Sequence, residues 1–219
     1  MATTIVTGAN RGIGLELCRQ LSARGDDIIA VCRQSSPELD ALEVRVEGID
    51  VSDDAAVRTL VQRLTDVRID LLINNAGILR GENLESLSSE GIEQQFEVNA
   101  LGPLRVSAAL LPQIAKGGKI AIITSRMGSI ADNTSGGYYG YRMSKAAVNA
   151  AGVSLARDVA GRGIAVTLIH PGMVATEMTG KHGIAPADAA RGVIARIDAL
   201  TPETTGKFWH AGTGEELPW

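Results

Sequence analysis

The sequence has few cysteines, few aromatic residues and no long apolar run. Its two cysteines, Cys18 and Cys32, are too few for a disulfide framework and lack metal-ligand spacing. Aromatic residues make up 3%, basic residues form no run, and the net charge is −4, which argues against a nucleic-acid partner. No apolar run approaches the roughly 18 residues of a membrane helix, and the first strand begins too early to follow a signal peptide. We therefore expect a cytoplasmic protein with reduced cysteines and no metal.

Short apolar runs alternate along the chain with helical patterns. The expected strands are Thr3–Thr7, Asp27–Cys32, Val44–Gly48, Leu71–Asn74, Lys119–Ser125, Ala165–His170 and Gly206–His210. The expected helices are Gly12–Arg24, Asp53–Val67, Glu90–Lys116 (bent or broken at Gly102-Pro103), Tyr141–Ala160 and Pro186–Leu200. Most strands are apolar throughout, as strands buried on both faces are. This alternation predicts one α/β domain over residues 1–219, with a doubly wound, seven-stranded, mostly parallel sheet flanked by helices.

A glycine-rich turn, Thr7-Gly8-Ala9-Asn10-Arg11-Gly12-Ile13-Gly14, directly follows the first expected strand. Such a turn, where it opens a helix, can hold the pyrophosphate of a dinucleotide on free N–H groups and the positive end of the helix dipole. A bare strand–helix connection is the alternative interpretation.

Tyr141 and Lys145 stand four residues apart at the start of an expected helix, so they share one face. A neighbouring ammonium, or a positively charged nicotinamide ring, favours the phenolate and lowers the pKa of a tyrosine. Such a tyrosine can exchange a proton with a substrate alcohol or carbonyl. Tyr138 and Tyr139 have no lysine four residues on, and we expect them to form pocket wall or packing.

In combination, these motifs resemble those of the short-chain dehydrogenase/reductase family, which has a Rossmann fold. The resemblance covers the whole chain, in the family's order. The matching positions are Thr7–Gly14, Asp50-Val51, Asn74–Gly77, Asn99, Ser125 with Gly128, Tyr141 with Lys145, and Pro171-Gly172. The segments following Ser125 and Asn133, and the tail after Gly206, are similar to those of Sniffer-type carbonyl reductases and C-factor-like proteins.

The resemblance implies four catalytic residues. Tyr141 is the general acid/base, and Lys145 lowers its pKa and holds the nicotinamide ribose. Ser125 hydrogen-bonds the substrate oxygen, and Asn99 holds a water that links Lys145 to solvent. Ser125 could instead only cap a loop, and Asn99 could be a polar group in a helix interior.

The resemblance also implies a cofactor site. Asp50-Val51 faces the adenine, although Asp50 could merely cap a turn, and Thr176 contacts the nicotinamide carboxamide, although it could be a plain loop hydroxyl. The full expected set is Gly8, Asn10, Arg11, Gly12, Ile13, Gly14, Arg33, Asp50, Val51, Asn74, Ala76, Gly77, Tyr141, Lys145, Pro171, Gly172, Val174 and Thr176.

The residues after the second strand indicate which nicotinamide cofactor is used. NAD-preferring sites commonly carry an acidic residue there, whereas this chain has Arg33, and Arg11 lies in the glycine turn. Two guanidinium groups suit a 2′-phosphate in charge and geometry. We therefore predict NADP(H), unless both arginines are only solvated surface charges.

The expected reaction is the NADPH-dependent reduction of an aldehyde, ketone or quinone to an alcohol. The sixteen positions from Ser125 to Tyr141 exceed the family's usual interval, which predicts a longer loop near an open substrate cleft. The alternatives are a non-catalytic NADP(H) sensor, which would not need these catalytic residues, and an epimerase or dehydratase, which usually has a larger C-terminal region. The two long helices could also form a homodimer or homotetramer.

Overall fold

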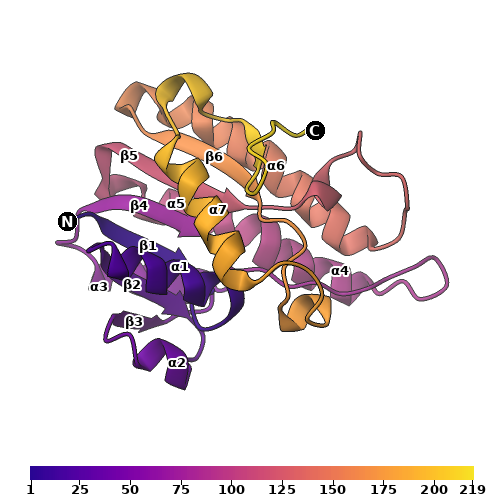
Figure 1. Cartoon of the computed structure of the whole chain (residues 1–219), viewed down its shortest axis with the longest axis horizontal. Coiled ribbons are helices and arrows are strands. Elements are labelled where there is room, and N and C mark those ends of the chain that lie inside the picture. The colour runs from indigo at the N-terminus through magenta and orange to yellow at the C-terminus, as the bar shows by residue number, and fades with distance from the viewer.

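The computed structural model describes residues 1–219, and all seven strands join one parallel sheet in the order β3-β2-β1-β4-β5-β6-β7 (Figure 1). The strands are β1 Thr3–Thr7, β2 Asp27–Cys32, β3 Arg45–Gly48, β4 Ile69–Asn74, β5 Ile114–Ile123, β6 Ala165–His170 and β7 Phe208–His210. Every neighbouring pair is parallel, so the predicted doubly wound fold is confirmed and the sheet has no antiparallel member.

Helices cover both faces of the sheet. They are α1 Gly12–Ala23, α2 Pro37–Asp40, α3 Asp54–Arg63, α4 Ser89–Phe96, α5 Gly102–Leu110, α6 Tyr139–Val159 and α7 Pro186–Asp198. The short helix α2 was not expected; Pro37 stands in its first turn, and the Ser36 side chain accepts a hydrogen bond from the Leu39 N–H. None of the helices combines the length and apolar character needed to cross a membrane.

The predicted helix Glu90–Lys116 is wrong at its C-terminal end and is divided in the middle. The π-helical turn Glu97–Leu101 separates α4 from α5, directly before the Gly102-Pro103 pair. The chain then leaves the helix and enters β5 at Ile114, which pairs with Ile69 of β4. This pairing across the sheet overrides the helical pattern of the last residues.

The hydrophobic core lies in two layers because alternate strand residues point to opposite faces. Val6 packs in the cluster that contains Leu17 of α1 and Val193 of α7, and these two helices lie in front of the sheet in Figure 1. Its neighbour Ile5 packs on the other side, in the cluster formed with α3, α5 and α6. Burial of each such side chain contributes about 1.5–3 kcal/mol.

The order of the strands reverses next to β1, because β2 lies on one side of it and β4 on the other. In open parallel sheets, ligands bind outside the carboxyl ends of the strands at such a reversal. These ends point to the right in Figure 1, where the segments after β4 and before α6 extend beyond the sheet.

Candidate active site

The glycine turn is held closed by very short backbone approaches. A Cβ atom on Gly14 would lie 2.1 Å from the carbonyl oxygen of Gly8, so no other residue fits there without displacement. Gly8 has a φ of 66°, and a Cβ there would lie 2.8 Å from Cα of Ala76. The first helix therefore packs closely on the turn only because these two positions are glycine.

Asn75, which sequence reasoning did not single out, secures this turn from the end of β4. Its Nδ2 donates to the carbonyl oxygens of Thr7 at 3.0 Å and Gly8 at 3.2 Å. In return, the Thr7 hydroxyl accepts from the backbone N–H groups of Asn75 and Ala76, both at 3.0 Å. The only sequence signal was the position of Asn75 in the Asn74–Gly77 motif.

The N-terminus of α1 is free to bind an anion. Arg11 precedes it without capping it through a side chain, and the first turn contains no acidic residue. The first N–H groups of a helix have no intrahelical partner, and here they adjoin glycines whose missing side chains leave the backbone accessible. These residues fit a dinucleotide pyrophosphate.

The four predicted catalytic residues come from three neighbouring segments. Tyr141 and Lys145 lie on α6 and are 8% and 4% exposed. Ser125 lies two residues beyond the end of β5 and is 8% exposed, and its hydroxyl accepts from the Met127 N–H at 3.1 Å. The Lys145 Nζ lies 5.8 Å from the centroid of the Tyr141 ring. Gly77, after β4, adjoins Asn99 and Lys145, since a Cβ there would lie 3.3 Å from Asn99 Oδ1 and 3.7 Å from Lys145 Nζ.

Burial shifts the pKa of both Tyr141 and Lys145 in the protein without cofactor. Burial lowers the pKa of Lys145 to about 8, and no carboxylate offsets it. Burial also raises the pKa of Tyr141, while the neighbouring Ser125 hydroxyl acts in the opposite direction. In the protein without cofactor the loss of hydration of the phenolate dominates the pKa of Tyr141; that Lys145 lowers this pKa stays a prediction.

Lys145 keeps donor capacity for a ligand. Its Nζ donates to the carbonyl oxygen of Ile123 at 3.0 Å, which uses one of three protons. A buried ammonium without a carboxylate needs further acceptors. The hydroxyls of a nicotinamide ribose have the chemistry to supply them.

Asn99 lies in the π-helical turn and is fully buried. Its Oδ1 accepts from the Ile78 N–H at 2.8 Å, and its Nδ2 donates to the Ile78 carbonyl at 2.8 Å and to the Ser144 hydroxyl at 3.0 Å. The Ser144 hydroxyl in turn donates to the Tyr141 carbonyl at 2.9 Å. The side chain thus fixes the segment after β4 to α6; whether Asn99 also holds a water stays a prediction.

The residues predicted at the adenine end have different surroundings. The Asp50 carboxylate accepts from the Ser52 N–H at 2.9 Å and the Ser52 hydroxyl at 2.6 Å, so it does cap its turn. Burial opposes its ionisation, but these hydrogen bonds and the nearby Arg33 and Arg105 leave the pKa of Asp50 below its usual value. Val51 is buried, and its Cγ2 atom would lie 3.2 Å from a Cβ on Gly102.

Of the two predicted phosphate-binding arginines, one is already paired. Arg11 forms an ion pair with Glu177, and both side chains are largely exposed. Arg33 is exposed at the end of β2. The Arg11–Glu177 pair joins the glycine turn to the segment after β6.

The segment after β6 lies against the glycine turn. Gly172 has a φ of 91°, and Pro171 and Val174 are buried. A Cβ on Gly12 would lie 3.1 Å from the Thr176 side chain. Pro171, Gly172, Val174 and Thr176 therefore belong to a segment that reaches the glycine turn, and their contact with the cofactor stays a prediction.

Other residues of the predicted cofactor-binding set make hydrogen bonds or packing contacts within the protein. The Asn74 side chain donates to the Ser107 hydroxyl of α5 at 2.9 Å and is 1% exposed, so it does not reach the cleft. The Asn10 carbonyl accepts from the Ser36 hydroxyl at 2.8 Å. Ile13 packs on the core beneath α1.

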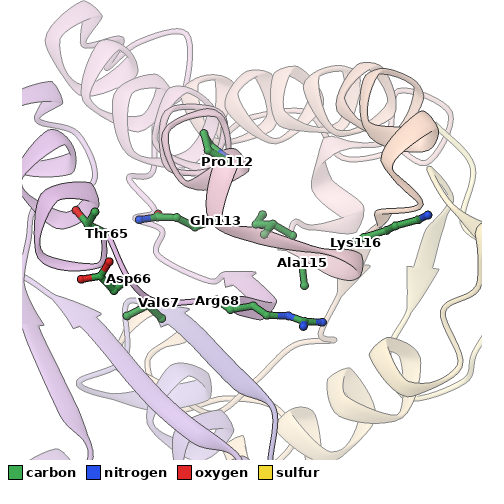
Figure 2. Close-up of a pocket in the computed structure, with 9 residues that line it drawn as sticks. Thr65, Asp66, Val67, Arg68, Pro112, Gln113, Ala115 and Lys116 are labelled. Carbon is green, nitrogen blue, oxygen red and sulfur yellow. The ribbon is translucent and has the colours of Figure 1, made fainter.

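Two hollows in the surface are lined by other residues than the four predicted catalytic ones. One, of about 480 Å³, lies between residues 65–68 and 112–116 at the amino ends of β4 and β5, opposite the glycine turn (Figure 2). The other, of about 290 Å³, is formed by residues 127–130, 133 and 136–137 and by Tyr139, Arg142, Met143 and Ala146 on a different face of α6 from Tyr141. Neither includes a predicted catalytic residue.

Comparison with known proteins places these features in a family. The family model described as short chain dehydrogenase matches residues 2–186. Over 227 aligned residues, covering all of both chains, the sequence is 44% identical to 1-hydroxy-2-glutathionyl-2-methyl-3-butene dehydrogenase of Rhodococcus sp. (strain AD45). It is 45% identical to C-signal of Myxococcus xanthus, over 69% of this chain and 93% of that protein.

Solved structures show the same fold over the whole chain. The NADPH-bound carbonyl reductase from chicken fatty liver superposes with a TM-score of 0.91 at 27% identity, over 100% of this chain and 99% of that chain. The carbonyl reductase Sniffer of D. melanogaster superposes with a TM-score of 0.91 at 26% identity, over 100% of both chains. The resemblance to Sniffer-type and C-factor-like proteins is confirmed by these matches.

Proposed function

Since the chain belongs to the short-chain dehydrogenase family and is an oxidoreductase, we propose that it reduces a carbonyl compound to an alcohol with NADPH. The expected substrates are aldehydes, ketones or quinones. The observation that carries the proposal is the burial of Tyr141 and Lys145 on one face of α6, beside Ser125 and without a carboxylate. A sensor without turnover would have no need of this arrangement.

In this proposal the bound nicotinamide supplies the hydride, and the protein supplies the proton. Tyr141 donates its hydroxyl proton to the substrate oxygen as the carbonyl is reduced. Ser125 donates a hydrogen bond to the same oxygen and so stabilises the developing negative charge. Lys145, with its free donors, binds the cofactor ribose, and its positive charge favours the phenolate that Tyr141 becomes.

The preference for NADP(H) rests on the arginines. Arg33 is exposed at the end of β2, where an acidic residue would favour NAD, and Arg11 lies in the glycine turn. Several solved structures of similar fold contain bound NADPH or NADP, including the chicken carbonyl reductase. We further propose that residues 1–219 work as a single cofactor-binding domain, in the cytoplasm, as a homodimer or homotetramer.

Turnover with a panel of carbonyl compounds tests the proposal. NADPH consumption is followed by its absorbance with aldehydes, ketones and quinones, and the same panel is run with NADH. The proposal predicts turnover with several members and a clear preference for NADPH. Tight NADPH binding without turnover of any compound would instead favour the sensor.

A second candidate is oxidation of an alcohol that carries a glutathionyl group. It is favoured by the 44% identity, over the full length of both chains, to a dehydrogenase named for such a substrate. The same residues serve in this direction, with Tyr141 accepting the proton. Adding NADP⁺ with glutathionyl alcohols to the panel distinguishes the two candidates by the direction that has the larger kcat/KM.

A further inference from the structure

Glu82 is a buried carboxylate that forms no ion pair. It lies in the segment between β4 and α4 and is 6% exposed. No lysine, arginine or histidine pairs with it. Buried carboxylates without a cation are rare, because removing the charge from water is unfavourable unless hydrogen bonds replace the lost hydration. The environment of Glu82 must therefore supply donors.

The donors come from two helices. Oε2 of Glu82 accepts from the backbone N–H of Gly140 at 3.2 Å, and Oε1 accepts from the Nε2 of Gln95 on α4. The backbone carbonyl of Glu82 also accepts from the Tyr138 N–H at 2.8 Å. Glu82 thus contacts the chain on both sides of the residue where α6 begins.

Helix α6 has no cap of its own. Tyr138, at its N-terminus, adopts a left-handed conformation with a φ of 53°, caps nothing with its side chain, and no acidic residue lies in the first turn. A carboxylate at the N-terminus of a helix satisfies free N–H groups and interacts favourably with the dipole. Glu82 supplies this carboxylate from a segment 58 positions away in the sequence.

The contact is built into the packing around it. A Cβ on Gly140 would lie 2.4 Å from Gln95 Nε2 and 3.0 Å from Ile92 Cα, so α6 meets α4 closely at this glycine. Gln95 is fully buried, and its Oε1 accepts from the Arg80 N–H at 2.9 Å. Glu82 and Gln95 therefore join the segment after β4, the C-terminal end of α4 and the start of α6.

The next residue after Gly140 is Tyr141. We infer that Glu82 is a positioning residue for Tyr141: it fixes the first turn of α6, and so the phenol, relative to Ser125. This inference rests on the proposed function. Tyr141 is held on its other side by the hydrogen bond from Ser144, which Asn99 supports, so Glu82 provides the N-terminal half of the alignment.

The conformation of the loop before α6 explains why Glu82 is needed to fix the first turn of this helix. Gly136, Gly137 and Tyr138 in succession have positive φ angles, and for Tyr138 this conformation is strained. A strained residue at the start of a helix keeps one conformation only where other contacts hold it in place. The two hydrogen bonds from Tyr138 and Gly140 to Glu82 do so.

Glu82→Gln tests the inference, with Glu85→Gln, an exposed residue of the same segment, as the matched control. The glutamine side chain has the same shape as Glu82. Its NH₂ group must, however, face either the Gln95 amide or the Gly140 N–H, which are both donors, so one hydrogen bond is lost. We expect kcat to fall about tenfold, in keeping with the sensitivity of catalysis to small displacements, while the Kd for NADPH changes less than about twofold because the glycine turn is untouched. Amide hydrogen exchange in residues 139–142 should become faster in this variant alone.

The outcomes separate the inference from the proposed function. A wild-type protein without activity refutes the proposed reaction. In that case, an unchanged rate of amide hydrogen exchange at Gly140 in Glu82→Gln would still refute the role of Glu82 at the start of α6. With an active wild type, a folded Glu82→Gln that keeps its kcat overturns the inference. If this variant does not fold, Glu82→Asp keeps the carboxylate but shortens the side chain by one methylene, which withdraws it from the Gly140 N–H. An unchanged kcat in Glu82→Asp also overturns the inference, and a lowered kcat at constant NADPH affinity supports it.

Discussion

The Nζ atom of Lys145 lies 5.8 Å from the centroid of the Tyr141 ring and donates to the Ile123 carbonyl at 3.0 Å, and both side chains are buried. No carboxylate is among the groups that shift the pKa of Lys145. The protein without cofactor therefore holds a buried cation whose charge is only partly compensated. Such a residue favours ligand binding at the expense of stability.

Lys145→Met is expected to stabilise the protein without cofactor. Burial lowers the pKa of Lys145 from 10.5 to about 8, which corresponds to about 3 kcal/mol of destabilisation below pH 8, and the lost hydrogen bond returns about 1 kcal/mol. The net gain of about 2 kcal/mol should raise the Tm by about 5 °C at pH 7. The unfolded state binds more protons between pH 8 and 10.5, so the stability of wild type should rise over this range and that of the variant should not. A lower Tm in Lys145→Met would contradict this account.

His170 is expected to make the protein sensitive to acid. Burial, then His210 and Arg126, lower the pKa of His170 from 6.5 to about 4, while Arg126 itself pairs with Asp132. As the pH falls through this interval, the unfolded state gains a proton that the folded state does not, which removes up to about 3 kcal/mol of stability. Urea unfolding of His170→Asn at pH 7 and pH 4.5 should show a smaller difference than wild type. The exposed His182→Asn serves as control, and equal differences in all three proteins would refute this cause.

Gly14→Ala is expected to disrupt the cofactor site. The added Cβ would lie 2.1 Å from the Gly8 carbonyl oxygen, so α1 must move away from the turn. Overpacking of this kind destabilises by about 1–3 kcal/mol, and we expect NADPH binding to weaken more than about tenfold because the N–H groups leave their positions. Gly161→Ala, where a Cβ meets no atom within 4 Å, is the control. Titration of both variants with NADPH gives the comparison, and wild-type affinity in Gly14→Ala would exclude the predicted geometry.

Arg33→Ala is expected to lower the affinity for NADPH and leave that for NADH unchanged. Loss of a charge-assisted contact to the 2′-phosphate corresponds to about tenfold or more in Kd. Arg11→Ala should have a smaller effect because Arg11 already pairs with Glu177, and Glu177→Gln should strengthen NADPH binding by about twofold. Arg19→Ala on α1, where Arg19 pairs with Glu16, controls for a general change in charge. Equal losses of affinity for NADPH and NADH in Arg33→Ala would show that Arg33 does not bind the 2′-phosphate.

Local patterns in the sequence predicted most of the fold. The strands β1, β2 and β6 have the bounds that their apolar runs indicate. The end of the helix predicted to reach Lys116 was wrong because Ile114 and Ala115 suit a helix or a strand equally well by periodicity. Pairing with β4, which the local sequence does not encode, makes them strand.

Site residues that belong to a sequence motif could be predicted, whereas residues that contact partners distant in the sequence could not. Tyr141, Lys145, Ser125 and Asn99 were found by spacing and resemblance, and the structure brings them together. Asn75 and Glu82 were missed because their partners, Gly8 and Gly140, lie 67 and 58 positions away. The raised pKa of Tyr141 was also missed, since it depends on burial that no spacing reveals.

The central claim is that Tyr141 delivers the proton, and the most direct test compares Tyr141→Phe with Tyr139→Phe, its neighbour on the other face of the same helix turn. Steady-state NADPH oxidation with the best carbonyl substrate is measured beside the Kd for NADPH. The account predicts that Tyr141→Phe loses about 100-fold or more of kcat and binds NADPH as wild type does, while Tyr139→Phe keeps its turnover. A Tyr141→Phe variant that turns over at the wild-type rate would contradict it.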